Sequence, residues 1–152
     1  MQKSIDIIKT TRQNFLNLLE TLSLEQLNKI PEGFNNNILW NFGHLVATQQ
    51  ILCNRLGNAT FHVEEYLVKK YGKGTKPEGF ITAEELDLLK KYVVSNIEDL
   101  EKDLENGVLD VYTAYTTSYN VQLETIADAI RFVAVHEGVH YGYAMALKRL
   151  VL

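Results

Sequence analysis

The spacing of the apolar residues is the feature that most constrains this fold. They recur every three or four positions over several long segments, which places them along one face of an α-helix rather than on alternate sides of a strand. Only two prolines occur in the 152 residues, and neither glycine nor proline precedes Pro31. The sequence therefore predicts a mostly helical protein.

The helix boundaries follow from this spacing together with capping residues. Ser23 with Gln26 has the spacing of a capping box. Thr82 with Glu85 has the same spacing, and Thr125 is a candidate N-cap for the last helix. The expected fold is an all-α four-helix bundle with short connecting helices, in one domain over residues 1–152. Its long helices are expected at about residues 2–21, 38–56, 82–106 and 125–150, with a short one within about 60–71.

Residues 108–123 are the one long segment rich in β-branched and aromatic residues. This composition is compatible with a short β-hairpin or with an extended loop, and we favour the loop. The segment also carries many hydroxyl groups, which would either bind a substrate or satisfy the backbone of their own loop. They belong to Thr113, Tyr115, Thr116, Ser118 and Tyr119.

Charge and cysteine content narrow the expected partners and compartment. A formal net charge of -4, with lysine and arginine only in scattered pairs, argues against nucleic acid as a partner. Cys53 is the only cysteine, so no internal disulfide can form and a reducing compartment fits. Because no segment has the apolar run of a membrane span or a signal peptide, we expect a cytoplasmic protein with no membrane partner.

Three of the four histidines have the placement of metal ligands. His136 and His140 are four positions apart on the last predicted helix, so their imidazoles share one face and can bind one divalent ion. A metal would also satisfy ring nitrogens that are otherwise costly to bury. His44 on the second helix is, taken alone, more typical of a core histidine. Together with the pair it becomes the third candidate ligand, and imidazole suits Zn, Ni, Cu and Fe alike.

Glu137 and His62 each allow two interpretations. Glu137 follows a metal-ligand candidate, as does the general base of thermolysin-like proteases, or it is a carboxylate behind the ligands or on the surface. The protease interpretation is weakened because Ala146 stands where a metzincin would have its third histidine. His62 lies outside the long helices, so we expect a surface residue, with an auxiliary or pH-sensitive role as the alternative.

Two segments together resemble the DinB/YfiT-like superfamily, which is unrelated to the DNA polymerase that shares part of its name. Residues 38–45 contain Trp40-x-x-x-His44, and residues 136–142 contain His136-x-x-x-His140. The resemblance covers nearly the whole chain. It implies a four-helix bundle with a divalent ion, Zn²⁺ or Ni²⁺, bound by His44, His136 and His140.

The same resemblance suggests an activity. Members of that family include metal-dependent transferases that use low-molecular-weight thiols such as bacillithiol or mycothiol, and a thiol-dependent maleylpyruvate isomerase. It implies a metal-dependent transferase with a thiol cosubstrate, a small-molecule substrate and a homodimeric assembly. A non-catalytic metal-binding or stress-response protein and a metal-dependent hydrolase are the alternatives. The catalytic candidates are Glu137 and Tyr141, with Thr48 and Tyr143 as further residues that could position substrate.

Overall fold

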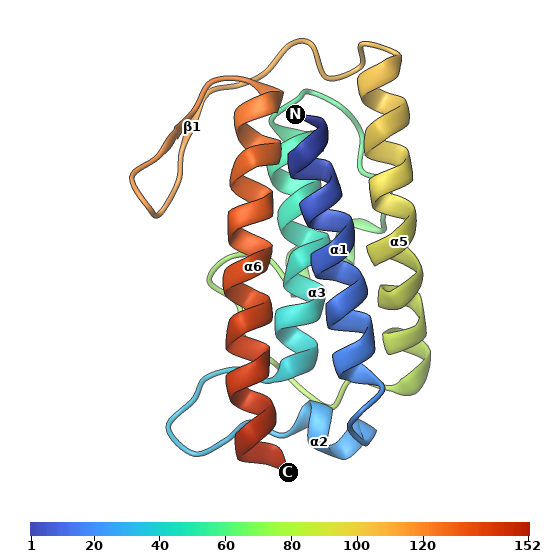
Figure 1. The fold of residues 1–152 in the computed structure, drawn as a ribbon, viewed down its shortest axis with the longest axis vertical. Coiled ribbons are helices and arrows are strands. Elements are labelled where there is room, and N and C mark those ends of the chain that lie inside the picture. Colours follow the sequence, from blue (N-terminus) through green and yellow to red (C-terminus); the bar gives the residue numbers. More distant parts are fainter.

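Four long helices form a bundle in the computed structural model, which describes residues 1–152. Figure 1 shows that α1 and α6 run in one direction and that α3 and α5 run in the opposite one. Both α1 and α3 contact α6 on one side and α5 on the other. The predicted all-α bundle is therefore confirmed, and none of its helices is both long and apolar enough to span a bilayer. The long helices are α1 (Gln2–Leu19), α3 (Ile38–Gln49), α5 (Ala83–Glu105) and α6 (Ile126–Val151).

Capping side chains begin several of these helices where the sequence predicts. Ser23 forms a reciprocal capping box with Gln26 at the start of the short helix α2 (Leu24–Asn28). Thr125 forms one with Asp128 at the start of α6. The Thr82 hydroxyl accepts a hydrogen bond from a backbone N–H of the first turn of α5. The short helix expected within 60–71 is α4 (Glu65–Lys70).

Residues 108–123 contain a short β-hairpin, so the preference for a loop was wrong. Its strands are β1 (Tyr115–Thr116) and β2 (Gln122–Leu123), which pair antiparallel. Asn120 takes a positive φ of 59° in the connection, a conformation that asparagine tolerates better than most residues. Leu123 is buried in the core, which anchors the second strand. Strand propensity thus prevails where a buried side chain fixes the register.

The second predicted helix is not uniform. The α-helical part, α3, passes directly into a π-helical segment, η1 (Gln50–Arg55). There the backbone N–H of Leu56 donates to the carbonyl of Ile51, five residues back, at 3.2 Å. Apolar spacing does not distinguish a π-helical turn from an α-helical one. Such turns occur frequently beside functional sites.

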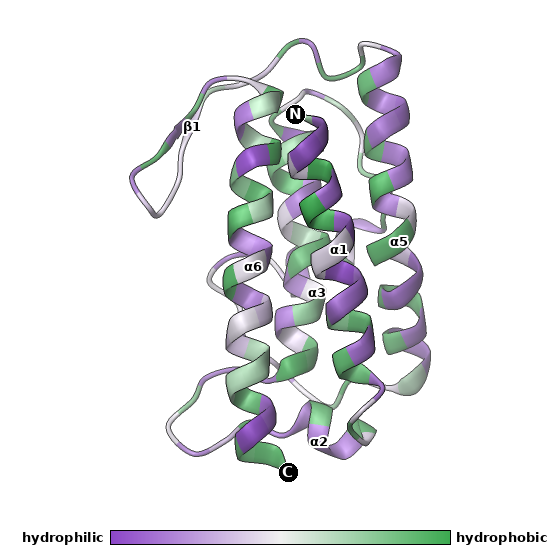
Figure 2. Cartoon of the chain, viewed as in Figure 1, coloured by the Kyte–Doolittle hydropathy of each residue, from purple (hydrophilic) through white to green (hydrophobic).

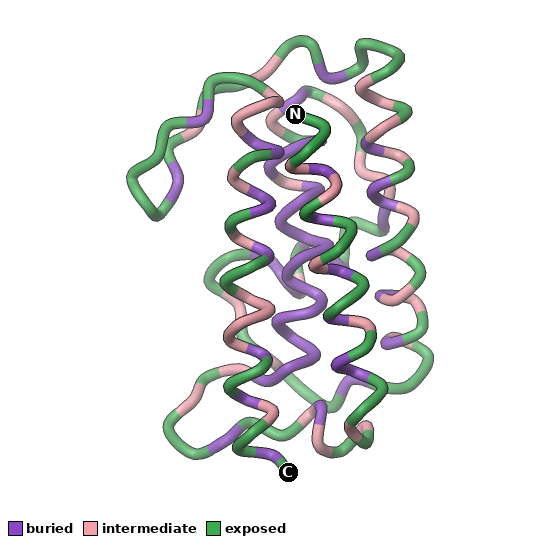
Figure 3. Tube along the Cα trace, in the orientation of Figure 1, coloured by how far each residue is buried: buried purple, intermediate pink, exposed green.

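The core consists of two apolar clusters. All residues of α3 are buried, whereas α1, α5 and α6 alternate buried and exposed residues (Figure 3). One cluster lies toward the α2 end of the bundle, around Phe15 and Phe42, and the other toward the hairpin end, around Ile8 and Ile130. The hydropathy colours of Figure 2 show hydrophilic and hydrophobic residues alternating along α1 and α5 as well.

A buried polar layer, which we define as Arg12, Gln49, Asn96 and Glu137, lies between these clusters. Arg12 on α1 is buried although it is charged. Its Nε donates to the Glu137 carboxylate at 3.1 Å, its Nη2 donates to Gln49 Oε1 at 2.6 Å, and a third bond reaches a backbone carbonyl of α5. Gln49 in turn donates to the Asn96 carbonyl at 2.8 Å. One guanidinium therefore connects all the long helices.

Candidate metal centre

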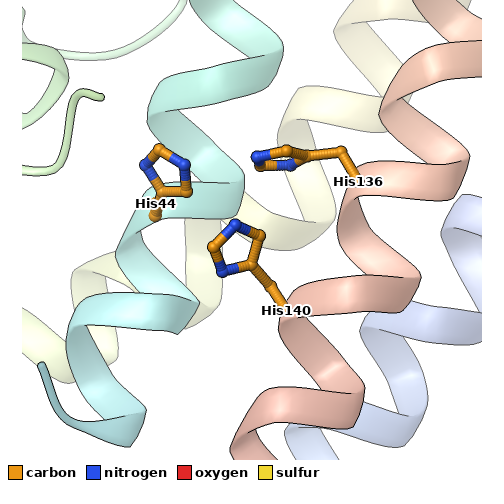
Figure 4. A group of neighbouring side chains, drawn as sticks. All are labelled: His44, His136 and His140. Atoms are coloured by element: carbon orange, nitrogen blue, oxygen red, sulfur yellow. The ribbon is translucent and has the colours of Figure 1, made fainter. Parts of the chain in front are cut away.

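The three predicted histidines come together between α3 and α6. Figure 4 shows His44 on α3 facing His136 and His140 on α6. Their ring centroids are 5.0 Å (His44–His136), 4.7 Å (His44–His140) and 4.4 Å (His136–His140) apart. One ring nitrogen of each histidine lies within 4.8 Å of those of the others. The group could therefore hold a divalent ion.

Hydrogen bonds on the far side of two rings leave the other ring nitrogen of each without a proton. His44 Nδ1 lies 2.6 Å from the Tyr71 backbone oxygen, and His140 Nδ1 lies 2.7 Å from Asn41 Oδ1. The Tyr71 backbone oxygen can only accept a hydrogen bond. Asn41 Oδ1 is an acceptor as well, because the amide nitrogen of Asn41 donates to Asn36 Oδ1 and to the Asn37 carbonyl. Each Nδ1 must therefore carry the proton. The Nε2 lone pair of His140 is then available to a metal, as in histidine metal sites generally. That of His44 is available once the Thr48 hydroxyl, 3.3 Å away, turns aside.

His136 supplies an independent test of whether an ion fits. Its Nδ1 is buried and has no hydrogen-bond partner in the chain. A buried polar atom without a partner is uncommon and costly. Three imidazoles that converge, one of them with an unsatisfied nitrogen, form a donor set that suits a divalent ion.

The three rings are electrically neutral at pH 7. Burial, with smaller contributions from His140 and His44, lowers the pKa of His136 to about 3. Burial and His44 lower the pKa of His140 to about 4. Burial also lowers the pKa of His44, against the opposing effect of its hydrogen bond to Tyr71. Protons therefore do not compete with a metal for these nitrogens near neutral pH.

Tyr71 packs closely against α3, and this places its backbone carbonyl next to His44. A Cβ on Gly43 would lie 2.5 Å from the Tyr71 ring, so only glycine admits this contact. On its other face, His44 stacks on Trp40 with 4.7 Å between ring centroids. Trp40 Nε1 donates to the Thr75 hydroxyl at 3.0 Å. The segment around residues 71–75 therefore helps to fix the orientation of a candidate ligand.

A cavity of about 210 Å³ opens beside the histidines. Thr48, Ile51 and Leu52 line it from α3 and η1, and Phe132 lines it from α6. Its other residues are Lys73 in the loop after α4 and Tyr115, Thr117, Ser118 and Tyr119 in the hairpin.

The hairpin is held against α6 next to this cavity. The Tyr119 ring contacts Phe132 edge-on, with centroids 5.5 Å apart. Thr117 Oγ1 accepts a bond from the Val121 N–H at 3.2 Å, so this hydroxyl does satisfy its own loop. The hydroxyls of Tyr115, Ser118 and Tyr119 form no hydrogen bond within the chain. The segment therefore provides a wall with free hydroxyl groups.

The two residues predicted to be catalytic do not line the cavity. Glu137 is fully buried in the polar layer, where Arg12 occupies its carboxylate. Burial raises the pKa of the Glu137 carboxyl, against the opposing effect of Arg12. Tyr141 packs on Phe15, with ring centroids 5.8 Å apart. A base or proton donor for the cavity is therefore not found at either position.

Of the three remaining candidates, one lines the cavity and two do not. Thr48 lines the cavity, and its Oγ1 lies 3.3 Å from His44 Nε2. Tyr143 packs instead on Phe34, with centroids 5.9 Å apart. His62 lies away from the centre, partly exposed, with Nε2 2.7 Å from Asp103 Oδ2. Only Thr48 among these is placed to touch a ligand.

Asn41, Tyr71 and Lys73 belong to the site but do not stand out in the sequence. Asn41 precedes His44 by about one helical turn, so its position in the tryptophan–histidine segment was an available signal. Tyr71 acts through its backbone oxygen, which no side-chain pattern reveals. Lys73 lies in a loop whose placement depends on tertiary contacts.

Comparison with known proteins identifies the family. No curated protein matches the chain. A sequence profile described as the DinB superfamily matches residues 7–144, a range that includes His44, His136 and His140. The resemblance carried by the tryptophan–histidine and histidine–histidine segments is thereby confirmed, and the chain belongs to the DinB superfamily.

Proposed function

We propose that this protein is a metal-dependent transferase that joins a low-molecular-weight thiol to a small electrophile. The observation that carries the proposal is the cavity beside the three histidines, with its free hydroxyls on Tyr115, Ser118 and Tyr119. A protein that only stored an ion would need no such space. Ligand pockets typically combine apolar walls with a few polar groups that fix orientation, which matches this cavity.

Different residues that line the cavity would have different roles in the reaction. Phe132 and Leu52 provide apolar surface that excludes water, while the hairpin hydroxyls orient the substrate. A divalent ion at the histidines would lower the pKa of a thiol and so supply a thiolate at neutral pH. The sulfur then bonds to the electrophilic carbon, the leaving group departs with the electrons of the bond that breaks, and the thiol proton goes to solvent.

A hydrolase is less well supported by the geometry. It would need a base near a metal-activated water. No carboxylate lines the cavity, and Glu137 is bound to Arg12 in the polar layer. The non-catalytic alternative differs in its prediction, because it expects metal binding without turnover.

The test is a conjugation assay on protein loaded with Zn²⁺ or Ni²⁺, with a panel of thiols and a model electrophile. We expect turnover that is lost in His44→Ala and in His140→Ala. His62→Ala is the matched control, since this histidine lies outside the centre, and it should retain activity. Metal binding with no turnover for any thiol would favour the non-catalytic alternative. Turnover retained in both ligand variants would refute a role for the metal.

We also propose that the protein is a homodimer. Family resemblance is the main support, and α6 offers exposed apolar side chains at Val135 and Val139, one turn apart. Sedimentation should give the mass of two chains at about tens of micromolar, where interfaces of modest size persist. A clean monomer at that concentration would count against the dimer.

A further inference from the structure

The charges around the cavity are of one sign. Lys73 is the only lysine or arginine that lines it, and no aspartate or glutamate does. Lys73 also forms no ion pair with any acid of the chain. With three neutral imidazoles and a divalent ion, the space would carry a net positive charge and attract an anion.

The backbone on both sides of Lys73 is fixed by hydrogen bonds to α3, the helix that carries His44. Two residues before it, the Tyr71 oxygen accepts from His44 at 2.6 Å. Two residues after it, the Thr75 hydroxyl accepts from Trp40 and donates to the Gly72 carbonyl at 2.9 Å. The same contacts that orient a candidate metal ligand therefore place the lysine at the cavity.

The nature of the anion follows from what surrounds this lysine. Phosphate groups are usually bound by several cations, an arginine fork or a cluster of backbone N–H groups. Here there is one ammonium group, and the nearby donors are the free hydroxyls of Ser118, Tyr115 and Tyr119. A single positive charge with neutral hydroxyl donors is matched to a carboxylate with one negative charge.

We infer that the thiol substrate of the transferase carries a carboxylate, which Lys73 binds while the sulfur of the same molecule lies near His44, His136 and His140. This inference rests on the proposed function. Lys73 then acts as a specificity-determining residue, because it selects charged substrates over neutral ones of the same shape. The attraction is partly screened at an exposed lysine, so its effect is modest.

The test compares two thiols that differ in one group: 3-mercaptopropionate and its uncharged amide, 3-mercaptopropionamide. Their dissociation constants for the metal-loaded protein are measured by calorimetry, without an electrophile. Wild type should prefer the carboxylate by about three- to tenfold, and added salt should reduce this preference. Lys73→Met should abolish it, and Lys73→Arg should restore it.

Lys76→Met is the matched control, because Lys76 is exposed in the same loop but does not line the cavity. It should leave the preference unchanged. A preference that persists in Lys73→Met would place the carboxylate elsewhere, on the metal for example, and would overturn the inference. Equal binding of both thiols by wild type would overturn it as well.

Conjugation assays on the same variants separate the two proposals. A carboxylate preference that depends on Lys73, without any turnover, would support the binding site and refute the transferase. Turnover with both thiols at equal KM in wild type would support the transferase and refute the role of Lys73.

Discussion

His136 and Glu137 follow one another on α6 and face different surroundings. His136 lies on the wall of a cavity and has a ring nitrogen without a partner. Glu137 is fully buried, and both of its carboxylate oxygens are bonded to Arg12. One residue therefore has unused binding capacity, whereas the other has none.

The difference separates binding from structural support on a single helix. Unused capacity at a cavity indicates a ligand site, and a complete set of partners in the interior indicates a contact that holds helices together. Glu137 contacts Arg12 of α1, which also bonds to Gln49 of α3, so the pair fixes α6 against its neighbours. Variants at the two positions should therefore fail in different ways.

The largest expected effect is on folding, at the buried pair. Glu137→Leu leaves the Arg12 guanidinium without its counter-charge and should lower the free energy of unfolding by about 3–5 kcal/mol. Glu101→Leu is the control, because Glu101 pairs with Lys9 of the same helix α1 at a partly exposed site. It should cost about 1 kcal/mol or less. Urea unfolding measures both, and equal losses would contradict the distinction.

The next effect is on metal affinity, at the cavity wall. His140→Ala removes one of three candidate ligands and should weaken Zn²⁺ binding by more than about 100-fold, since losing only an outer partner costs 10–100-fold. Competition with a chromophoric chelator measures the affinity. The metal-free variant should unfold within about 1 kcal/mol of wild type. His62→Ala should bind as wild type, and unchanged affinity in His140→Ala would rule out His140 as a ligand.

A smaller effect on metal affinity is expected at Asn41, the hydrogen-bond partner of the candidate ligand His140. Asn41→Leu removes the acceptor that holds the proton on His140 Nδ1, and should weaken Zn²⁺ binding by about 10–100-fold. The same competition assay applies. Asn36→Ala removes a partner of Asn41 but leaves the bond between Asn41 and His140, so its affinity should stay close to wild type. If both variants bind alike, the hydrogen bond does not orient the ring.

The smallest effect, counted per pH unit, is that of pH on the stability of the metal-free protein. The pKa of His136 is lowered from 6.5 to about 3, so the unfolded chain takes up a proton that the folded one excludes. The contribution of His136 to stability should be constant above about pH 6.5 and fall below it, by up to about 1.4 kcal/mol per pH unit for one excluded proton. His136→Gln should flatten the slope between pH 6.5 and 4, measured by urea unfolding. An unchanged slope would contradict the burial of a neutral His136.

The same part of α6 shows which buried residues the sequence predicts and which it does not. Ala129, Val133, Ala144 and Leu147 follow one another at helical spacing, which predicts a buried face, and all four are buried. The same spacing includes His136 and His140 in that face, but both are only partly buried, whereas Glu137 is fully buried. Hydropathy assigns a carboxylate to the surface. Only its partner Arg12, 125 positions away, explains its burial.

The residues of the candidate site likewise fall into those that the sequence predicts and those that it does not. Histidines four residues apart on a helix and a tryptophan–histidine pair are local patterns, and they led to the three residues that converge. The hairpin wall, the Tyr71 oxygen and the placement of Lys73 depend on contacts between distant segments. Sequence periodicity contains no information about such contacts.

The two walls of the cavity differ in how well they would tolerate substitutions. The histidines stand on two packed helices, whereas Ser118, Tyr119 and Lys73 stand on connecting segments. Connecting segments tolerate substitution and insertion far better than packed helices do. The ligand preference of the cavity could therefore change by exchange of the hairpin tip, without any change to the three histidines. A library randomised at residues 117–119, screened for the small molecules that it binds, would show how far this wall alone sets that preference.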